Sequence, residues 1–163
     1  MMLLKSSLLR LGTLQEALQW YETNLCNVQL SDPRGYRVRF NLDDFIHLVQ
    51  LKNKYGKEPK NRRIAIQEIK RGNMKFETGR FDEQRTLELP WARDIATRPD
   101  LICQNWQVLG SGKELYIRDF GGGVGSAKYR VLVCKVRGTV RQVVTVFPRE
   151  RIGERETRCL IWP

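Results

Sequence analysis

The single histidine of the chain, His47, is the side chain best suited to proton transfer near neutral pH. It lies in the segment 41–51, where helical spacing predicts a buried stripe of four apolar residues, Leu42, Phe45, Ile46 and Val49. At about 100° per residue, His47 projects away from that stripe, on the side of Asp43 and Asp44. A carboxylate one turn back can fix the imidazole tautomer, so His47 is a candidate general acid or base. The same pattern is also typical of a surface histidine that is simply paired with Asp43.

The absence of a second histidine excludes a two-histidine mechanism. The other proton-transfer group would have to be a Glu, Lys, Arg, Tyr or Thr side chain. The four cysteines are widely spaced and form no C-x-x-C pair, and one histidine adds too few ligands for a zinc site. We therefore predict no metal and no other cofactor. Reduced cysteines of this kind are typical of a cytoplasmic protein.

The chain carries a large positive charge, because 29 Lys and Arg against 18 Asp and Glu give a net charge of +11 and a pI of about 9.9. Such an excess favours a polyanionic partner, since binding to phosphates releases counterions. The segment 52–71 contributes strongly, with eight cations and only Glu58 and Glu68 as acids. Each observation has an alternative to polyanion binding. The basic composition would serve only to keep the chain soluble, and the charged segment 52–71 would form an ordinary solvent-exposed face.

Four apolar runs rich in Val, Ile, Tyr, Phe and Trp predict an antiparallel meander in the C-terminal half. The runs cover residues 101–109, 113–120, 129–138 and 140–147, with turn residues between them. A short alternating strand at 36–40, after a turn at 32–35, is expected to pair with the edge of this meander.

Helices are predicted upstream, in the segments 13–25, 41–51, 61–71 and 91–97. The first of them has one apolar face, formed by Leu14, Ala17, Leu18, Tyr21 and Leu25. We expect the helices to cover one face of the sheet and to leave the other open as the working surface.

Strand phase selects the candidates for phosphate binding. In the run 129–138, Lys135 and Arg137 share one face, and the opposite face is more apolar and should meet the helices. In the run 140–147, the odd-numbered residues share a face in the same way. A face that bears Arg141, Thr145, Lys135 and either Tyr116 or Arg118 is therefore a candidate for phosphate binding. The alternative is that these are simply amphipathic strands with no ligand.

Two motifs add a resemblance to a known group of proteins. One runs from Phe45-Ile46-His47-Leu48 to Leu51 after a short strand, and the other is Val143-Val144-Thr145-Val146-Phe147-Pro148. In order and spacing they resemble the phage and prophage nuclease-like domains of the Barnase–EndoU–colicin–RelE (BECR) superfamily. The resemblance implies an α+β fold, with N-terminal helices packed on a C-terminal four-stranded antiparallel sheet. It implies a helical extension at 1–35, the nuclease domain at 36–148 and a basic tail at 149–163, all within one compact domain.

Members of that superfamily are typically metal-independent ribonucleases and often toxins, so the resemblance implies an active site with His47 and Thr145. Strand phase alone assigns the cations. Lys135, Arg118 and Arg141 are the candidates for the positively charged catalytic group, with Lys135 placed first. Four side chains are candidates for substrate binding, Arg118, Arg141, Tyr116 and Arg137. The single histidine of this chain departs from the two-histidine members of the superfamily.

RNA supplies its own nucleophile, the 2′-hydroxyl, so an enzyme needs a base, an acid and groups that stabilise the charged phosphorane. We expect RNA, including tRNA, to be cut to a 2′,3′-cyclic phosphate and a 5′-hydroxyl without added metal, and an acidic inhibitor protein would be a second partner of a toxin. The run 1–12, broken by Lys5 and Arg10, is too short to span a membrane, so we expect no membrane partner and a place in the cytoplasm of a bacterial or phage-infected cell. The alternatives are a non-catalytic nucleic-acid-binding module and an accessory phage protein of the same fold.

Overall fold

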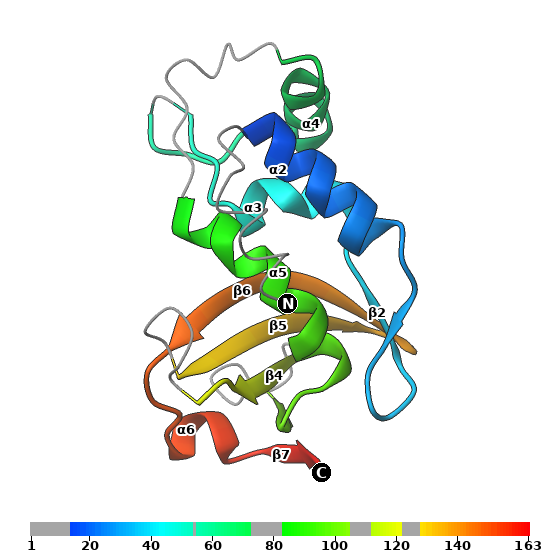
Figure 1. Cartoon of the computed structure of the whole chain (residues 1–163), viewed down its shortest axis with the longest axis vertical. Coiled ribbons are helices and arrows are strands. Elements are labelled where there is room, and N and C mark those ends of the chain that lie inside the picture. The colour runs from blue at the N-terminus through cyan, green and yellow to red at the C-terminus, as the bar shows by residue number, and fades with distance from the viewer. Residues whose placement is uncertain (1–13, 54, 73–82, 105–111, 122–127) are drawn as a thin grey trace. The chain divides into compact units, whose positions relative to one another are not determined.

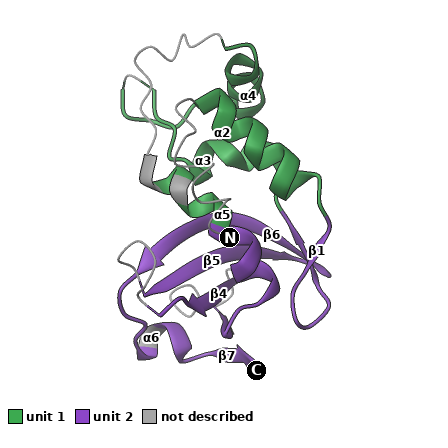
Figure 2. Cartoon of the chain, in the orientation of Figure 1, with its two compact units in different colours: residues 1–28, 40–90 green, residues 29–39, 91–163 purple. Residues whose placement is uncertain are grey.

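The computed structural model describes residues 14–53, 55–72, 83–104, 112–121 and 128–163 (Figure 1). The chain divides into two compact units, which we call unit 1 (residues 1–28 and 40–90) and unit 2 (residues 29–39 and 91–163; Figure 2). The chain therefore passes between the units three times. The domain boundaries expected at residues 36 and 148 stay a prediction.

Unit 1 is helical. Its elements are α2 (Leu14–Tyr21), the π-helical turn η1 (Glu22–Cys26), the 3-10 turn η2 (Leu42–Asp44), α3 (Phe45–Leu48), α4 (Arg62–Lys70) and the first half of α5 (Glu83–Thr97). The apolar face predicted for the first helix is confirmed, since all five of its residues are buried. The predicted helix at 61–71 is confirmed as α4, where the Asn61 side chain caps the helix by accepting a hydrogen bond from the Ile64 amide at 3.1 Å.

The segment 41–51 forms a shorter helix than expected, because only η2 and the single turn of α3 are helical. Its predicted stripe still faces the core, where Phe45, Ile46 and Val49 are fully buried. Helix α5 begins earlier than the expected residue 91 and contains Pro90 within it. In the part of the chain that the structure describes, no helix is both long and apolar enough to cross a lipid bilayer, and the run 1–12 lies outside that part.

Unit 2 contains a seven-stranded mixed sheet, in the order β1-β2-β6-β5-β4-β3-β7. The four predicted runs form its centre as an antiparallel meander of β3 (Leu101–Gln104), β4 (Lys113–Asp119), β5 (Tyr129–Arg137) and β6 (Val140–Arg149). The sequence beyond Gln104 that was expected to continue β3 lies outside the described residues. The α+β class is therefore confirmed, but a sheet of only four antiparallel strands is wrong.

Three short strands, two of which were not predicted, extend the meander. They are β2 (Arg37–Arg39), which pairs with β6 in parallel, β1 (Leu30–Ser31), antiparallel to β2, and β7 (Leu160–Trp162), antiparallel to β3. The pairing of β2 with the edge of the meander confirms the expectation for residues 36–40. Strands of two or three residues carry too little alternation to be recognised in a sequence, which is why β1 and β7 were missed.

The two faces of the sheet are named here by the residues of β5 that they carry. The even face includes Leu132 and Cys134, and Tyr116 of β4 lies on it because Tyr116 is paired with Leu132. The odd face includes Val131 and Val133, which belong to a buried apolar cluster with Cys103, Leu115 and Ile117, with Ile152 packed against it.

Both faces are thus buried at the centre of the sheet, and the expectation of one fully open face is wrong there. The reason can be read from β5, where five consecutive residues, 130–134, are all buried. Continuous runs of this kind are typical of strands that are covered on both sides.

Candidate functional site

A β-bulge at Val144 decides which candidate side chains can act together. Val133 of β5 pairs with Thr145 of β6, but the next residue, Cys134, pairs with Val143, so Val144 is an extra residue on β6. The alternation of side chains along β6 therefore changes phase at this point. Thr145 shares the odd face with Val133, whereas Val143 lies on the even face with Cys134.

The candidates predicted to lie on one face of the sheet are consequently divided between two. The odd face carries Lys135, Arg137 and Thr145, whereas the even face carries Tyr116, Arg118 and Arg141. The expectation that all of them share an open face is wrong, because simple alternation along residues 140–147 does not allow for the bulge. Lys135 and Arg137 are exposed, and Thr145 is half-buried.

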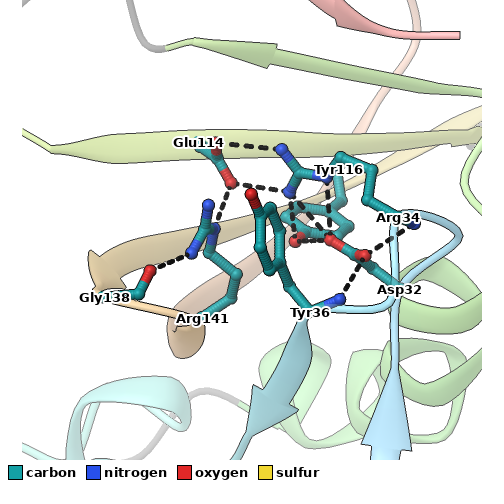
Figure 3. Close-up of polar contacts among 7 residues, drawn as sticks. All are labelled: Asp32, Arg34, Tyr36, Glu114, Tyr116, Gly138 and Arg141. Carbon is teal, nitrogen blue, oxygen red and sulfur yellow. Dashed lines mark hydrogen bonds and ion pairs between the residues drawn. The ribbon is translucent and has the colours of Figure 1, made fainter.

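On the even face, Tyr116 and Arg141 belong to a buried network of charges (Figure 3). Arg141 donates through Nε to Glu114 Oε1 at 2.6 Å, and Arg34 donates to the same carboxylate at 2.8 Å and to Asp32 Oδ2 at 2.8 Å. The Tyr116 hydroxyl donates to Asp32 Oδ2 at 2.6 Å. Two guanidinium groups thus face two carboxylates, and their formal charges cancel.

The network ties the turn between β1 and β2 to the centre of the sheet. Asp32 also accepts from the backbone amides of Arg34 and Tyr36, at 2.8 and 3.1 Å, and Gly35 completes the turn with a positive φ of 89°. Arg141 is only 5% exposed and Tyr116 is fully buried. These two candidates therefore hold the fold of unit 2 together, and neither presents its polar group to solvent.

The ionisation of the network follows from its contacts. Burial opposes the charged form of Glu114, but the hydrogen bonds and charges of Arg34 and Arg141 outweigh it and hold its pKa below the usual range. Burial likewise opposes ionisation of Asp32, and the hydrogen bonds from Tyr116 and Arg34 hold the pKa of that carboxyl low. Burial, followed by the hydrogen bond to Asp32, raises the pKa of Tyr116. The network is thus ionised at its carboxylates and neutral at its phenol near pH 7.

The third candidate on the even face, Arg118, is held by neighbours of its own. Its guanidinium donates to the Arg98 carbonyl oxygen at 2.5 Å and lies 5.4 Å from the centre of the Phe120 ring. Phe120 in turn packs edge-on against Trp91, with 5.1 Å between ring centres. Through these contacts Arg118 fastens the loop after α5 to the sheet.

In unit 1, His47 is paired with a carboxylate that the sequence analysis did not identify. Its Nδ1 lies 3.3 Å from Glu58 Oε2, and its side chain is 40% exposed. The expected partners were Asp43 and Asp44, but the carboxylate of Asp44 accepts from Arg62 at 2.9 Å. Arg62 also donates to Glu58 Oε1 at 2.6 Å, so one guanidinium holds both carboxylates in place.

Hydrogen bonds determine which groups are charged in the cluster formed by His47, Glu58, Arg62 and Asp44. Burial disfavours the charge on Glu58, but the hydrogen bonds from Arg62 and then from His47 prevail and lower its pKa. Glu58 is therefore an anion at neutral pH and fixes a proton on Nδ1 of the imidazole. Because Glu58 engages Nδ1, Nε2 is the ring atom that would exchange a proton with a substrate. An exposed imidazole oriented by a carboxylate is an arrangement suited to general acid–base catalysis.

Only a weak sequence signal pointed to Glu58. It lies four residues before Arg62, the spacing of an ion pair on a helix, but it sits in the loop ahead of α4 and eleven residues after His47. His47 belongs to unit 1, whereas Lys135 and Thr145 belong to unit 2, so the convergence of these three side chains stays a prediction. Among the described residues, no group of three or more His, Cys, Asp or Glu side chains is placed to hold a metal ion.

Comparison with known proteins adds no relative: no protein-family model, no curated protein and no solved structure matches this chain. The BECR resemblance therefore depends only on the motifs around His47 and Thr145, and the function must be argued from the residues themselves.

We expect the Glu114→Gln variant to lose about 3 kcal/mol of unfolding free energy, because it leaves Arg34 and Arg141 buried with too little negative charge. The measurement is urea denaturation followed by tryptophan fluorescence. Glu150→Gln, at an exposed position just after β6, is the matched control and should change the midpoint little. Equal midpoints for the two variants would contradict the structural role of the network.

The same network should make unit 2 sensitive to acid. The pKa values of Asp32 and Glu114 are lower in the folded chain than the value of about 4 that applies when it is unfolded. Their contribution to stability is therefore complete above about pH 4 and is lost as the pH falls through the folded pKa values. Thermal melts at pH 7, 5 and 3 should show the main loss between the last two, and the loss should be smaller in Glu114→Gln. A midpoint that does not fall between pH 5 and pH 3 would contradict this expectation.

Proposed function

We propose that the chain is a metal-independent endoribonuclease in which His47 transfers the proton. The observation that carries the proposal is the exposed imidazole of His47 with Nδ1 held 3.3 Å from Glu58. A proton-transfer group must be accessible and held in one orientation, and His47 with its fixed carboxylate meets these requirements. The net charge of +11 supports a phosphate-rich substrate.

In the proposed reaction the 2′-oxygen of the RNA attacks the adjacent phosphorus while the bond from phosphorus to the 5′-oxygen breaks. The 2′-hydroxyl proton goes to a base and the leaving 5′-oxygen receives a proton from an acid, so the products are a 2′,3′-cyclic phosphate and a 5′-hydroxyl. Nε2 of His47 serves one of these two steps. Thr145 donates a hydrogen bond to a phosphate oxygen, and Lys135 stabilises the charge that develops on the phosphorane.

The proposal leaves Arg141 and Tyr116 out of the substrate site because their polar groups are used within the buried network. Arg137, which is exposed on the same face as Lys135, keeps its assigned role in substrate binding. With this function the partner is RNA, the compartment is the cytoplasm, and a toxin of this kind would require an acidic inhibitor in the cell that makes it.

The His47→Ala variant should lose RNA cleavage by about 100-fold or more, since this is the usual contribution of a general acid or base. The assay follows an end-labelled RNA in the presence of EDTA and identifies the cyclic phosphate among the products. Gln67→Ala, at an exposed position on α4, serves as the control and should cleave like the parent chain. Undiminished cleavage by His47→Ala would refute the proposal, and RNA binding should be retained in that variant.

A double-mutant cycle tests whether His47 and Thr145 act on one phosphate. We expect Thr145→Val to reduce cleavage about tenfold in the parent chain and to have little further effect in His47→Ala, because groups that act together are not additive. Thr139→Val, in the exposed turn before β6, is the control. Losses that multiply in the double variant would show that the two side chains act independently.

A non-catalytic nucleic-acid-binding module is the second candidate, and one observation favours it. Arg62 bridges Glu58 and Asp44, so the cluster around His47 also fastens the loop that contains Glu58 to η2. A structural clamp of this kind would explain the position of His47 without any catalysis. The non-catalytic module predicts salt-dependent RNA binding, with no RNA cleavage by the parent chain or by any variant.

A further inference from the structure

Cationic side chains form two rows across neighbouring strands on the odd face of the sheet. In the first row, Arg39 of β2 is paired with Gln142 of β6, Gln142 with Lys135 of β5, and Lys135 with Lys113 of β4. Residues that are paired in register on adjacent strands project from the same face. One line of four side chains from four strands therefore carries three positive charges.

The second row lies two residues further along the strands. Arg37 of β2 is paired with Val140 of β6, which is paired with Arg137 of β5, and Ser31 of β1 lies on the other side of Arg37. At about 3.3 Å per residue the rows are roughly 7 Å apart, and neighbouring strands are about 4.8 Å apart. The five cations of the two rows thus occupy a small area at one end of the odd face.

These cations are accessible, and among the described residues no acid forms an ion pair with them. Arg37, Arg39, Lys135 and Arg137 are exposed, and Lys113 is half-buried. Within the ranges that the structure describes, none of the five forms an ion pair. Lys113 lies directly opposite Lys135, although like charges in that position repel and destabilise a sheet.

The cations on the even face differ from those in the rows, because they are paired with acids. On that face Asp32 and Glu114 neutralise Arg34, from the turn before β2, and Arg141, from β6. Glu114 follows Lys113 directly in β4, yet its side chain points to the even face. Asp32 and Glu114 thus balance the arginines of the even face, whereas the nearest carboxylate of β4 on the odd face, Asp119, lies six residues from Lys113 and pairs with Lys128.

We propose that these two rows, which we call the cationic rows, bind the phosphate backbone of RNA. The inference rests on the proposed function and adds the surface that holds its substrate. Charge complementarity argues for a polyanion, and the position of Thr145 argues for the reaction's own substrate. Thr145 is paired with Val133, two residues from Lys135 in β5, and the bulge at Val144 places its side chain on the odd face beside the first row. An RNA strand that crosses the rows would bring its phosphates to this hydroxyl.

The test compares two triple variants that lose the same charge from different places in unit 2. The row variant is Arg39→Gln, Lys113→Gln and Lys135→Gln, and the control variant is Arg98→Gln, Arg151→Gln and Arg158→Gln, all three at exposed positions. Each lowers the net charge from +11 to +8, since three cations are removed. Both are made in the full-length His47→Ala chain, so that a single-stranded RNA stays intact while its affinity is measured over a range of salt concentrations.

We expect the row variant to lower the slope of log affinity against log salt by about 2, because each lost phosphate contact contributes about 0.7 for a single strand. Relative to 1 M salt, that slope corresponds to an affinity about 50-fold weaker at about 0.15 M. The control variant should keep the slope of the parent. Urea midpoints check the fold, and the row variant should be at least as stable as the parent because the repulsion between Lys113 and Lys135 is removed.

Equal salt slopes and equal RNA affinities for the two triple variants would overturn the proposal. The rows would then bind an acidic protein or have no partner. The cleavage assay with the otherwise unchanged chain separates this failure from failure of the proposed function. Cleavage without any dependence of RNA binding on the rows would refute only the surface, whereas row-dependent binding without cleavage would refute only the ribonuclease.

Discussion

One extra residue in β6, Val144, sets the chemical character of unit 2. Odd-numbered residues of β6 point to the even face before the bulge and to the odd face after it. Arg141 is therefore directed into the buried network, whereas Thr145 points toward the cationic rows. Without the extra residue, one of the two would be on the wrong face: either a buried carboxylate would lose its partner, or the hydroxyl would be withdrawn from the rows. The bulge therefore lets one strand contribute to the buried network on one face and to the surface proposed to bind RNA on the other.

The network on the even face is the second constraint, and it is costly to build. Four charged groups are removed from water, and their mutual hydrogen bonds at 2.6–3.2 Å offset much of the loss of hydration. Tyr36 adds to this, because the Arg141 guanidinium lies 4.1 Å from the centre of its ring. The result is a short strand, β2, that is fixed in register against β6 although it contributes only three residues. That register places Arg37 and Arg39 in line with the cations of β5.

The features that follow from local pattern could be predicted from the sequence. The four central strands and the buried face of α2 depend on residues that are close together in the chain, and periodicity reveals them. The bulge, the Glu58 partner of His47 and the role of Glu114 could not be predicted. Arg34 and Glu114 are eighty residues apart, and a bulge differs from regular alternation by one residue whose side chain, valine, suits either face. Such features depend on pairings between distant segments, which a single sequence does not display.

The distribution of carboxylates explains how a chain with so many cations can fold and still keep a positive surface. Each acid in the two buried or half-buried clusters holds an arginine: Asp32 and Glu114 in unit 2, Asp44 and Glu58 in unit 1. Partial or full burial makes these pairs less sensitive to salt than the exposed cations of the rows, which are screened over about 8 Å at physiological ionic strength. The charges that stabilise the fold are therefore not those of the cationic rows. RNA binding at the rows, as proposed, would weaken with salt while the fold persists.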